Sequence, residues 1–496
     1  MRHKIFIAFL SLLTATSTLD MAKAQSLPYK NKNLPIEERV EDLLNRMTVD
    51  EKIAQIRHIH SSKIFNGQEL DMKKLTDWAG NTSWGFVEGF PLTGDNCAKS
   101  MYLIQKYMVE KTRLGIPIFT VAESLHGAVH DGATIYPQNI ALGSTFNPEL
   151  ARKKTQMISD DLHSMGFRQV LSPCIDVVRD LRWGRVEESY GEDPYLCGLF
   201  GIEEVSGYLE NGISPMLKHY GPHGNPLSGL NLASVECGLR DLHEIYLKPF
   251  EMVVKNTGIL AVMSTYNSWN HIPNSASHYL LTDILRDEWG FKGYVMSDWG
   301  AVNDRVKGLA AGLDLEMPSS GGLNDAKIVE AVKNGTLDEK VLDTAVKRIL
   351  EQVYRYRDVK GGEHIFDRSA DHKKAADIAK ECIVLLKNDG ALPLPHSNAK
   401  IAFIGAFAKD PRIQGGGSSH INTGNISNAL DSAAKYSDVS YAEGYERESN
   451  DTNPALLEEA VQLAADSDVA VIFAGLPDSF ESEGYDRQHI RMPDCQ

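Results

Sequence analysis

Short apolar runs separated by helix-sized intervals are the dominant pattern between residues 83 and 320. They lie at Trp84–Val87, Ile116–Val121, Val170–Ile175, Pro215–Lys218, Leu260–Met263, Tyr294–Met296 and Leu313–Met317. Apolar runs that do not alternate with polar residues are typical of parallel strands with both faces buried. Strands of this kind, each followed by a helical stretch, predict a (β/α)8 barrel, which takes about 250 residues.

A second α/β unit is predicted after the barrel. Its strand candidates are Ile383–Leu386, Lys400–Ile404, Val439–Ala442 and Val469–Ala474, with a helix at 454–466. Four strands are few for an open doubly wound sheet, so we expect this α/β sandwich domain to be incomplete and C-terminally truncated. The expected division is a barrel at 25–356, a polar linker at 357–375 and the sandwich domain at 376–496.

Residues 1–24 have the pattern of a signal peptide. Arg2 and Lys4 supply a charged start, residues 5–15 are apolar, and Ala22-Lys23-Ala24 is a small-residue cleavage site. The apolar stretch is shorter than the ~20 residues that span a bilayer, and no later stretch is long and apolar enough. We therefore expect an exported protein without a membrane span, periplasmic or secreted after cleavage near Ala24.

The charge balance restricts the class of partner. The chain has 51 Lys and Arg against 67 Asp and Glu, a net charge of −16. Nucleic-acid binding needs a basic face, so the sequence predicts no nucleic-acid partner. An acidic chain fits a neutral or cationic ligand but does not select one.

Polar residues follow almost every predicted barrel strand. They are Glu123 and His126, Asp176 and Arg179, Lys218 and His219, Tyr266 and Asn267, and Asp298. The carboxyl ends of barrel strands meet at one rim, so we expect these side chains to converge on a single pocket. Asp298 is the strongest candidate, because an unpaired carboxylate is costly to bury after an apolar strand, although it could also cap the next helix.

The sequence predicts no metal site and no cofactor. His219 and His223 have the spacing of helical metal ligands, but Gly221, Pro222 and Gly224 break any helix there and no third ligand is near. His126 and His130 fail for the same reason. The glycine run at 415–417 lacks the pattern of a phosphate-binding loop, so a flexible loop is the better interpretation.

Six motifs, in chain order, resemble those of glycoside hydrolase family 3, the two-domain β-glucosidase and β-xylosidase group. They are Met47-Thr48 with Glu51-Lys52, Glu123-Ser124-Leu125-His126-Gly127 with Gly132–Pro137, Arg182–Arg185 with Tyr190–Pro194, Lys218-His219-Tyr220, Met263–Asn267, and the segment that ends at Asp298. The resemblance extends from about residue 33 to 496. It implies a retaining, exo-acting β-glycosidase that removes terminal glucosyl or xylosyl residues from oligosaccharides or from aryl and alkyl β-glycosides, without a cofactor.

The resemblance also implies a role for each site residue. Asp298 would be the nucleophile and Glu483 the general acid/base, with Glu481 as the fallback. The substrate-binding residues would be Glu123, Arg185, Lys218, His219, Met263, Tyr266 and Trp299. Asp298 is expected to be ionised, with its pKa lowered by Arg185 or Lys218, whereas Glu483 is expected to hold a proton near neutral pH. Glu123 stands where many members have Asp, which weakens the choice between glucose and xylose.

Two alternatives stay open. A branch of the family hydrolyses N-acetylhexosaminides with a histidine acid/base, and His223 lies in a segment that partly resembles its loop, although Asn225–Ser228 departs from that pattern. The chain could also be a non-catalytic carbohydrate-binding fragment, if a truncated second domain does not hold Glu483 in place.

Overall fold

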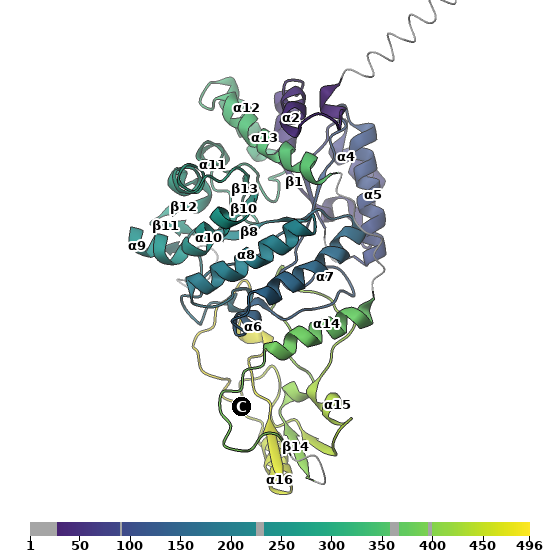
Figure 1. The fold of residues 1–496 in the computed structure, drawn as a ribbon, viewed down its shortest axis with the longest axis vertical. Coiled ribbons are helices and arrows are strands. Elements are labelled where there is room, and N and C mark those ends of the chain that lie inside the picture. Colours follow the sequence, from purple (N-terminus) through teal and green to yellow (C-terminus); the bar gives the residue numbers. More distant parts are fainter. Residues whose placement is uncertain (1–26, 90–91, 225–232, 358–366, 395–398) are drawn as a thin grey trace, which may run out of the picture.

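The computed structural model describes residues 27–89, 92–224, 233–357, 367–394 and 399–496. Figure 1 shows a large α/β unit and a smaller one at its end, with helix α14 (Arg368–Glu381) on the side of the large unit that faces the small one. The predicted signal peptide lies outside the described residues. Among the helices that are described, none is long and apolar enough to cross a bilayer.

Parallel strands form a closed ring in the large unit. One sheet has the order β1 (His58–His60), β4 (Phe86–Glu88), β5 (Phe119–Ala122), β6 (Gln169–Val170) and β7 (Ser214–Pro215). The other contains β8 (Leu217–Tyr220), β10 (Ala261–Ser264) and β13 (Tyr294–Met296). Parallel bridges Cys174–Lys218, Met296–Leu315 and Arg57–Glu316 join the two sheets at both ends, which confirms the predicted barrel.

Helices cover the outside of this ring, as the strand–helix alternation predicts. They include α5 (Gly94–Lys111), α7 (Glu149–Met165), α8 (Pro194–Glu210), α10 (Lys248–Asn256), the π-helical η6 (Tyr279–Glu288), α11 (Arg305–Ala311), α12 (Leu323–Lys333) and α13 (Glu339–Tyr356). The aromatic rings of Phe86, Phe119 and Tyr294 fill the inside of the ring, with centroids 5.5 Å apart from Phe86 to each of the others. The barrel is therefore a packed core, and a ligand can enter only at a rim.

Two further helices, α2 (Ile36–Leu44) and α3 (Val49–Gln55), precede the first strand. The hydroxyl of Thr48 accepts a hydrogen bond from the backbone N–H of Glu51, whose carboxylate accepts one from the N–H of Thr48. This reciprocal capping satisfies two N–H groups that a helix start leaves without partners.

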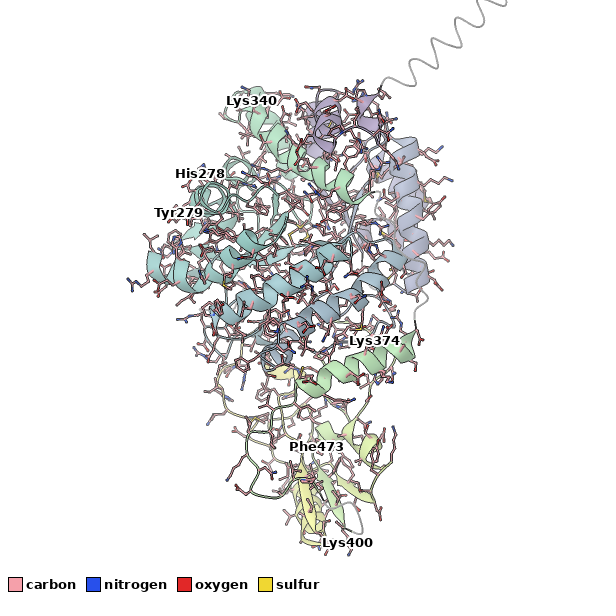
Figure 2. All side chains as sticks on the ribbon, viewed as in Figure 1. His278, Tyr279, Lys340, Lys374, Lys400 and Phe473 are labelled. Carbon is pink, nitrogen blue, oxygen red and sulfur yellow. The ribbon has the colours of Figure 1, made fainter. Side chains whose placement is uncertain are left out.

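The small unit has a parallel sheet of order β15 (Val439–Ala442), β14 (Ile401–Ile404) and β16 (Val469–Ile472), with helices α15 (Ala429–Ala433) and α16 (Pro454–Ala465). The rings of Phe403 and Phe473 lie 4.8 Å apart in its core, and Figure 2 places Phe473 in this unit. Three of the predicted strands are thus confirmed, and the α/β character of this domain with them.

One strand prediction was wrong, and another strand takes its predicted place in the ring only through isolated bridges. Ile383–Leu386 is not a strand, and its side chains are exposed to solvent. Leu313–Met317 pairs with its neighbours only through the single bridges at Leu315 and Glu316. Of the predicted linker, residues 358–366 lie outside the described residues, and residues 368–375 belong to α14.

Candidate active site

A cavity of about 310 Å³ opens at the rim formed by the carboxyl ends of the barrel strands. All nine predicted site residues line it: Glu123, Arg185, Lys218, His219, Met263, Tyr266, Asp298, Trp299 and Glu483. Eight come from the barrel, and Glu483 comes from a loop of the small unit that follows β16. The structure therefore brings together residues that the sequence separates widely, whereas their chemical roles stay predictions.

Glu123 and Lys218 form a pair on one wall of the cavity. The ammonium of Lys218 donates to both carboxylate oxygens of Glu123 at 3.1 Å, and both side chains are buried. Burial raises the pKa of Glu123, and although burial opposes the charge of Lys218, the facing carboxylate raises the pKa of Lys218. A charged pair with further hydrogen-bonding capacity in a cavity suits the binding of sugar hydroxyls.

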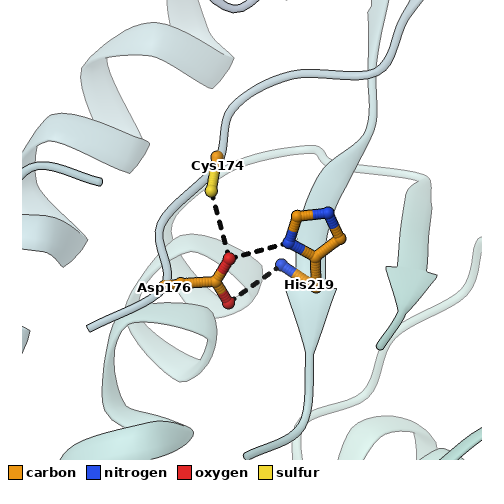
Figure 3. A group of neighbouring side chains, drawn as sticks. All are labelled: Cys174, Asp176 and His219. Atoms are coloured by element: carbon orange, nitrogen blue, oxygen red, sulfur yellow. Dashed lines mark hydrogen bonds and ion pairs between the residues drawn. The ribbon is translucent and has the colours of Figure 1, made fainter. Parts of the chain in front are cut away.

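Asp176 holds the imidazole of His219 in one orientation (Figure 3). One carboxylate oxygen of Asp176 lies 2.7 Å from Nδ1 of His219, and the other accepts from the backbone N–H of His219 at 3.2 Å. Burial and Arg185 lower the pKa of His219 to about 3, so its ring is neutral. Nδ1 then carries the proton toward Asp176, which leaves Nε2 as an acceptor facing the cavity.

The same cluster contains the one group of potential metal ligands found in the described ranges. Single ligand atoms of Cys174, Asp176 and His219 lie within 4.8 Å of one another. The thiol of Cys174 donates to Asp176 at 3.1 Å, and burial raises the pKa of that thiol, so it stays protonated. These atoms already satisfy each other, and the arrangement is that of a hydrogen-bonded support for His219.

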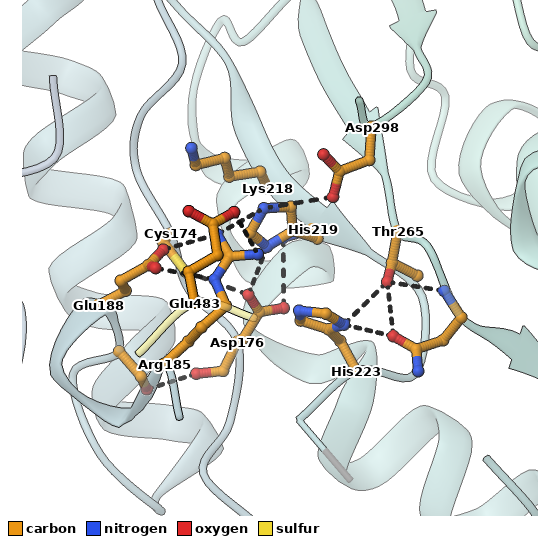
Figure 4. Close-up of polar contacts among 12 residues, drawn as sticks. Cys174, Asp176, Arg185, Glu188, Lys218, His219, His223, Thr265, Asp298 and Glu483 are labelled. Carbon is orange, nitrogen blue, oxygen red and sulfur yellow. Dashed lines mark hydrogen bonds and ion pairs between the residues drawn. The ribbon is translucent and has the colours of Figure 1, made fainter. Parts of the chain in front are cut away.

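Arg185 lies at the centre of the polar contacts in the cavity (Figure 4). Its guanidinium donates two hydrogen bonds of 2.8 Å to Glu188 and lies 3.3 Å from Nε2 of His219. One further nitrogen lies 3.6 Å from a carboxylate oxygen of Glu483. Arg185 thus links the barrel half of the site to the residue that the small unit contributes.

The protonation expected for the two catalytic candidates is reversed in the structure. Burial raises the pKa of Asp298 to about 7, and one oxygen of Asp298 lacks a hydrogen-bond partner in the described structure. For Glu483, burial is outweighed by Arg185 and by the backbone N–H of Ser418, which donates at 2.6 Å, and the pKa falls to about 2. The cause is that Arg185 lies beside Glu483, whereas Asp298 faces the unprotonated Nε2 of His219 at 3.7 Å.

The loop that carries Glu483 is fixed to the barrel by hydrogen bonds to backbone groups of the barrel. The carboxylate of Asp486 accepts from the N–H of Gly184 at 2.9 Å, and the N–H of Arg487 donates to the carbonyl of Arg182 at 2.8 Å. A side chain at Gly184 would collide with the carbonyls of Ser482 and Tyr485. Glycine is therefore required where the two units touch.

The glycine run at 415–417 belongs to the same junction and supports Glu483. A Cβ atom at Gly415, Gly416 or Gly417 would collide with Glu187, Ser482 or Glu483 in turn. The run is a loop, as predicted, and it packs closely against these side chains.

The other sequence candidates lie elsewhere. Glu481 binds Arg412 at 2.9 Å and lines a separate cavity between the two units. His223 is buried beside Thr265 and does not line the active-site cavity. His126 contacts Gln414 at 3.2 Å, as one of the bonds between the units.

Three lining residues with polar side chains were not predicted from the sequence: His60, Glu88 and Ser418. His60 and Glu88 end the neighbouring strands β1 and β4 and are paired in register. Glu88 directly follows a predicted apolar run, as Glu123 follows another, and this signal could have revealed it. His60 has no comparable signal, because its strand is not apolar.

Comparisons with known proteins agree with this geometry. The chain matches the family models described as glycosyl hydrolase family 3 N terminal domain, over residues 48–352, and glycosyl hydrolase family 3 C-terminal domain, over residues 383–496. The thermostable beta-glucosidase B of Acetivibrio thermocellus is 39% identical over 77% of this chain and 53% of its own length. The exo-alpha-(1->6)-L-arabinopyranosidase of Bifidobacterium longum is 37% identical over 76% and 53%. The periplasmic beta-glucosidase of Salmonella typhimurium is 29% identical over 92% and 65%.

Solved structures show the same likeness. The beta-glucosidase of Bifidobacterium adolescentis has a TM-score of 0.75 at 33% identity and is matched by 91% of this chain over 60% of its own. The beta-glucosidase of Erythrobacter marinus has a TM-score of 0.82 at 28% identity, over 93% and 68%. The chain spans about half the length of the first two curated relatives.

Proposed function

The chain belongs to glycosyl hydrolase family 3, and we propose that it is a retaining, exo-acting β-glycosidase. The observation that carries the proposal is that two carboxyl groups, Asp298 and Glu483, line one cavity of monosaccharide scale among Arg185, Lys218 and His219. Two carboxyl groups that flank the glycosidic bond are the minimal apparatus of glycoside hydrolysis. The substrates proposed are oligosaccharides and aryl or alkyl β-glycosides with a terminal glucosyl or xylosyl residue.

The proposed mechanism is a double displacement. The carboxylate of Asp298 attacks the anomeric carbon, and Glu483 gives its proton to the leaving glycosidic oxygen. The covalent glycosyl-enzyme is then hydrolysed by a water molecule, from which Glu483 takes a proton. Retaining enzymes hold such carboxyl groups about 5–5.5 Å apart.

Substrate binding must reverse the protonation of Asp298 and Glu483. Glycone hydroxyls that accept hydrogen bonds from Arg185 weaken its attraction for Glu483, and the pKa of Glu483 then rises under burial. Positive charge that develops at the anomeric carbon favours the ionised form of Asp298 at the same time. Arg185 is placed to serve both changes, since it affects the pKa of each carboxyl.

We also propose the division and location of the chain. The barrel at 25–356 supplies the nucleophile, and the α/β domain at 376–496, after a linker at 357–375, supplies the acid/base. Export to the periplasm or beyond, with cleavage near Ala24, is supported by the signal-peptide pattern of residues 1–24.

Two substitutions test the roles. Asp298→Ala should remove nearly all release of p-nitrophenol from the aryl β-glucoside and β-xyloside, because no covalent intermediate can form. Glu483→Ala should spare aryl glycosides whose leaving group needs little protonation, and azide should restore its rate by attacking the glycosyl-enzyme. Glu481→Ala is the matched control from the same loop and should retain activity.

Other outcomes would replace this proposal. Wild-type rates for Asp298→Ala would exclude it as nucleophile. Loss of turnover in His223→Ala with full activity in Glu483→Ala would favour the N-acetylhexosaminidase alternative. Glucose binding in a calorimeter without turnover of any aryl glycoside would favour a carbohydrate-binding protein.

A further inference from the structure

Glu88 is a carboxyl group in the active-site cavity that the proposed mechanism does not use. It ends strand β4, beside His60 of β1, and it lines the same cavity as Glu123. Its side chain is 13% exposed, so most of it is removed from water. A buried carboxyl is costly unless it is paired or hydrogen-bonded, so its presence needs an explanation.

The structure gives Glu88 an incomplete set of partners. Its Oε2 atom has no hydrogen-bond partner within the described residues, and neither does either ring nitrogen of the fully buried His58. Nε2 of His58 is the ionisable neighbour of Oε2, but the two atoms are 3.4 Å apart, which is too long for a strong hydrogen bond. Two polar groups are thus held side by side, both short of partners, and of the two Glu88 also lines the cavity.

The position of Glu88 in the barrel fixes which part of a ligand it would meet. Strand β4 lies between β1 and β5, and the charged groups that act on Glu88 are Glu123 and Lys218. Around the ring, the segment at 313–317 and strand β1 lie between β4 and β13, the strand that Asp298 follows. A sugar with its anomeric carbon between Asp298 and Glu483 would therefore turn its opposite end toward Glu88.

We propose that Glu88 is a specificity-determining residue that hydrogen-bonds a glycone hydroxyl at the end of the ring opposite the anomeric carbon, on C4 or C6. This inference rests on the proposed function, because it uses the ring orientation that the catalytic pair imposes. It selects substrates whose non-reducing end presents such a hydroxyl. Glu88 and the Glu123–Lys218 pair would then form hydrogen bonds with neighbouring hydroxyls of one sugar.

The protonation of Glu88 supports a hydrogen bond in both directions. Burial and the neighbouring Glu123 raise the pKa of Glu88 to about 8, against the opposing effect of Lys218. The groups that face it are His58 and His60 from β1, Glu123 after β5 and Lys218 from β8, and burial lowers the pKa of His58 to about 3. At neutral pH Glu88 is a carboxylic acid, which both donates and accepts, as a sugar hydroxyl does.

A substrate–enzyme double cycle tests the assignment. kcat/KM is measured for wild type, Glu88→Ala and Glu88→Gln with the p-nitrophenyl β-glycoside that the wild type cleaves faster, and with its 4-deoxy and 6-deoxy analogues. We expect Glu88→Ala to lower kcat/KM roughly 10- to 100-fold on the parent substrate and less than about threefold on the analogue that lacks the contacted hydroxyl. Glu88→Gln keeps a donor and an acceptor and should retain most of the activity.

The matched control is Glu316→Gln. Glu316 is a buried glutamate of the same barrel, its backbone forms a parallel β-bridge with that of Arg57, and it does not line the cavity. It should show no dependence on the deoxy position. An equal loss of kcat/KM for Glu88→Ala on the parent and both analogues, or no loss at all, would overturn the proposal. A residue with a purely structural role would lower kcat/KM whether or not the substrate carries that hydroxyl.

Calorimetry separates this proposal from the proposed function. If the wild type turns over no aryl β-glycoside, the affinities for glucose, 4-deoxyglucose and 6-deoxyglucose are compared between wild type and Glu88→Ala. A difference confined to sugars that carry the contacted hydroxyl would support the role of Glu88 even where the catalytic assignment fails. Equal affinity of both proteins for all three sugars would overturn it.

Discussion

Arg185 holds two carboxylates in the active site, and Arg185→Met should show how much this arrangement contributes to stability. The side chain of Arg185 is 2% exposed and that of Glu188 is fully buried, with two hydrogen bonds of 2.8 Å between them. Removing one partner of a buried ion pair costs about 3–5 kcal/mol, because the other charge is left unpaired. Methionine keeps most of the length of the side chain, so the cavity it leaves is small.

The lowered pKa of Glu483 gives a second estimate of the free energy of unfolding that Arg185→Met should remove. Its pKa is lowered from an ordinary 4.5 to about 2. At about 1.4 kcal/mol per tenfold change in proton affinity, this favours the ionised form by roughly 3 kcal/mol. The two contributions share one guanidinium and are not additive, so we expect a loss of about 3–5 kcal/mol in the free energy of unfolding at pH 7.

The sign of the pH dependence follows from the lowered pKa of Glu483. A carboxyl whose pKa is depressed by folding stabilises the fold above its unfolded value, and this stabilisation is lost as the pH falls through the folded value. For Glu483 the window runs from pH 4.5 down to about 2. The stability difference between wild type and Arg185→Met should therefore shrink across that window.

Urea denaturation at pH 7 and at pH 3, followed by circular dichroism and tryptophan fluorescence, measures both effects. Arg182→Met is the control, because Arg182 lies in the same loop, pairs with Asp180 and does not line the cavity. Adding Glu188→Gln to Arg185→Met should recover part of the loss, since it removes the unpaired carboxylate. Equal stability of the two arginine variants at pH 7, or a deficit that does not shrink at pH 3, would refute the reasoning.

Three further predictions concern the support of the site and the fold. Asp176→Asn should lower kcat/KM by at least about tenfold, because the amide no longer fixes the proton of His219 on Nδ1; an unchanged rate would contradict this. Thr48→Ala should destabilise the protein by about 1 kcal/mol in urea denaturation and leave kcat/KM unchanged, because the capping contact with Glu51 is lost. The pKa values of about 7 for Asp298 and about 2 for Glu483 predict that kcat/KM is level between pH 5 and 7 and falls above about pH 7, because the active form carries one proton on the pair; a rise in kcat/KM from pH 5 to 7 would contradict the reversed protonation.

Stability should respond to Asp298 in the opposite direction. A carboxyl whose pKa is raised by folding binds its proton more tightly in the folded state. Its contribution to stability is therefore present below the ordinary value of 3.8 and is lost as the pH rises toward about 7. The pH range in which Asp298 is ionised is thus also the range in which it destabilises the fold.

The barrel could be predicted because its strands carry their own signal. Tyr294–Met296 and Val439–Ala442 were predicted at the bounds that the structure shows, since continuous apolar runs have few other uses. Strand β1 was not predicted, because His58-Ile59-His60 is not an apolar run. Only its pairing with β4 makes it a strand. The opposite error occurred at Ile383–Leu386, where an apolar run has no strand pairing in the part of the chain that the structure describes.

The sequence predicts which residues line the site, but it does not predict their protonation. Membership follows from topology, because a residue after a barrel strand, such as Glu123 or Asp298, points to the rim wherever its neighbours lie. Protonation depends on which charges lie within a few ångströms. The sequence does not show whether Arg185 lies nearer Asp298 or nearer Glu483. Its two bonds to Glu188 hold the guanidinium 3.6 Å from a carboxylate oxygen of Glu483. The same bonds limit how far Arg185 can move toward a substrate. The rise in the pKa of Glu483 on binding must therefore come from sugar hydroxyls that compete for the guanidinium N–H groups facing the cavity.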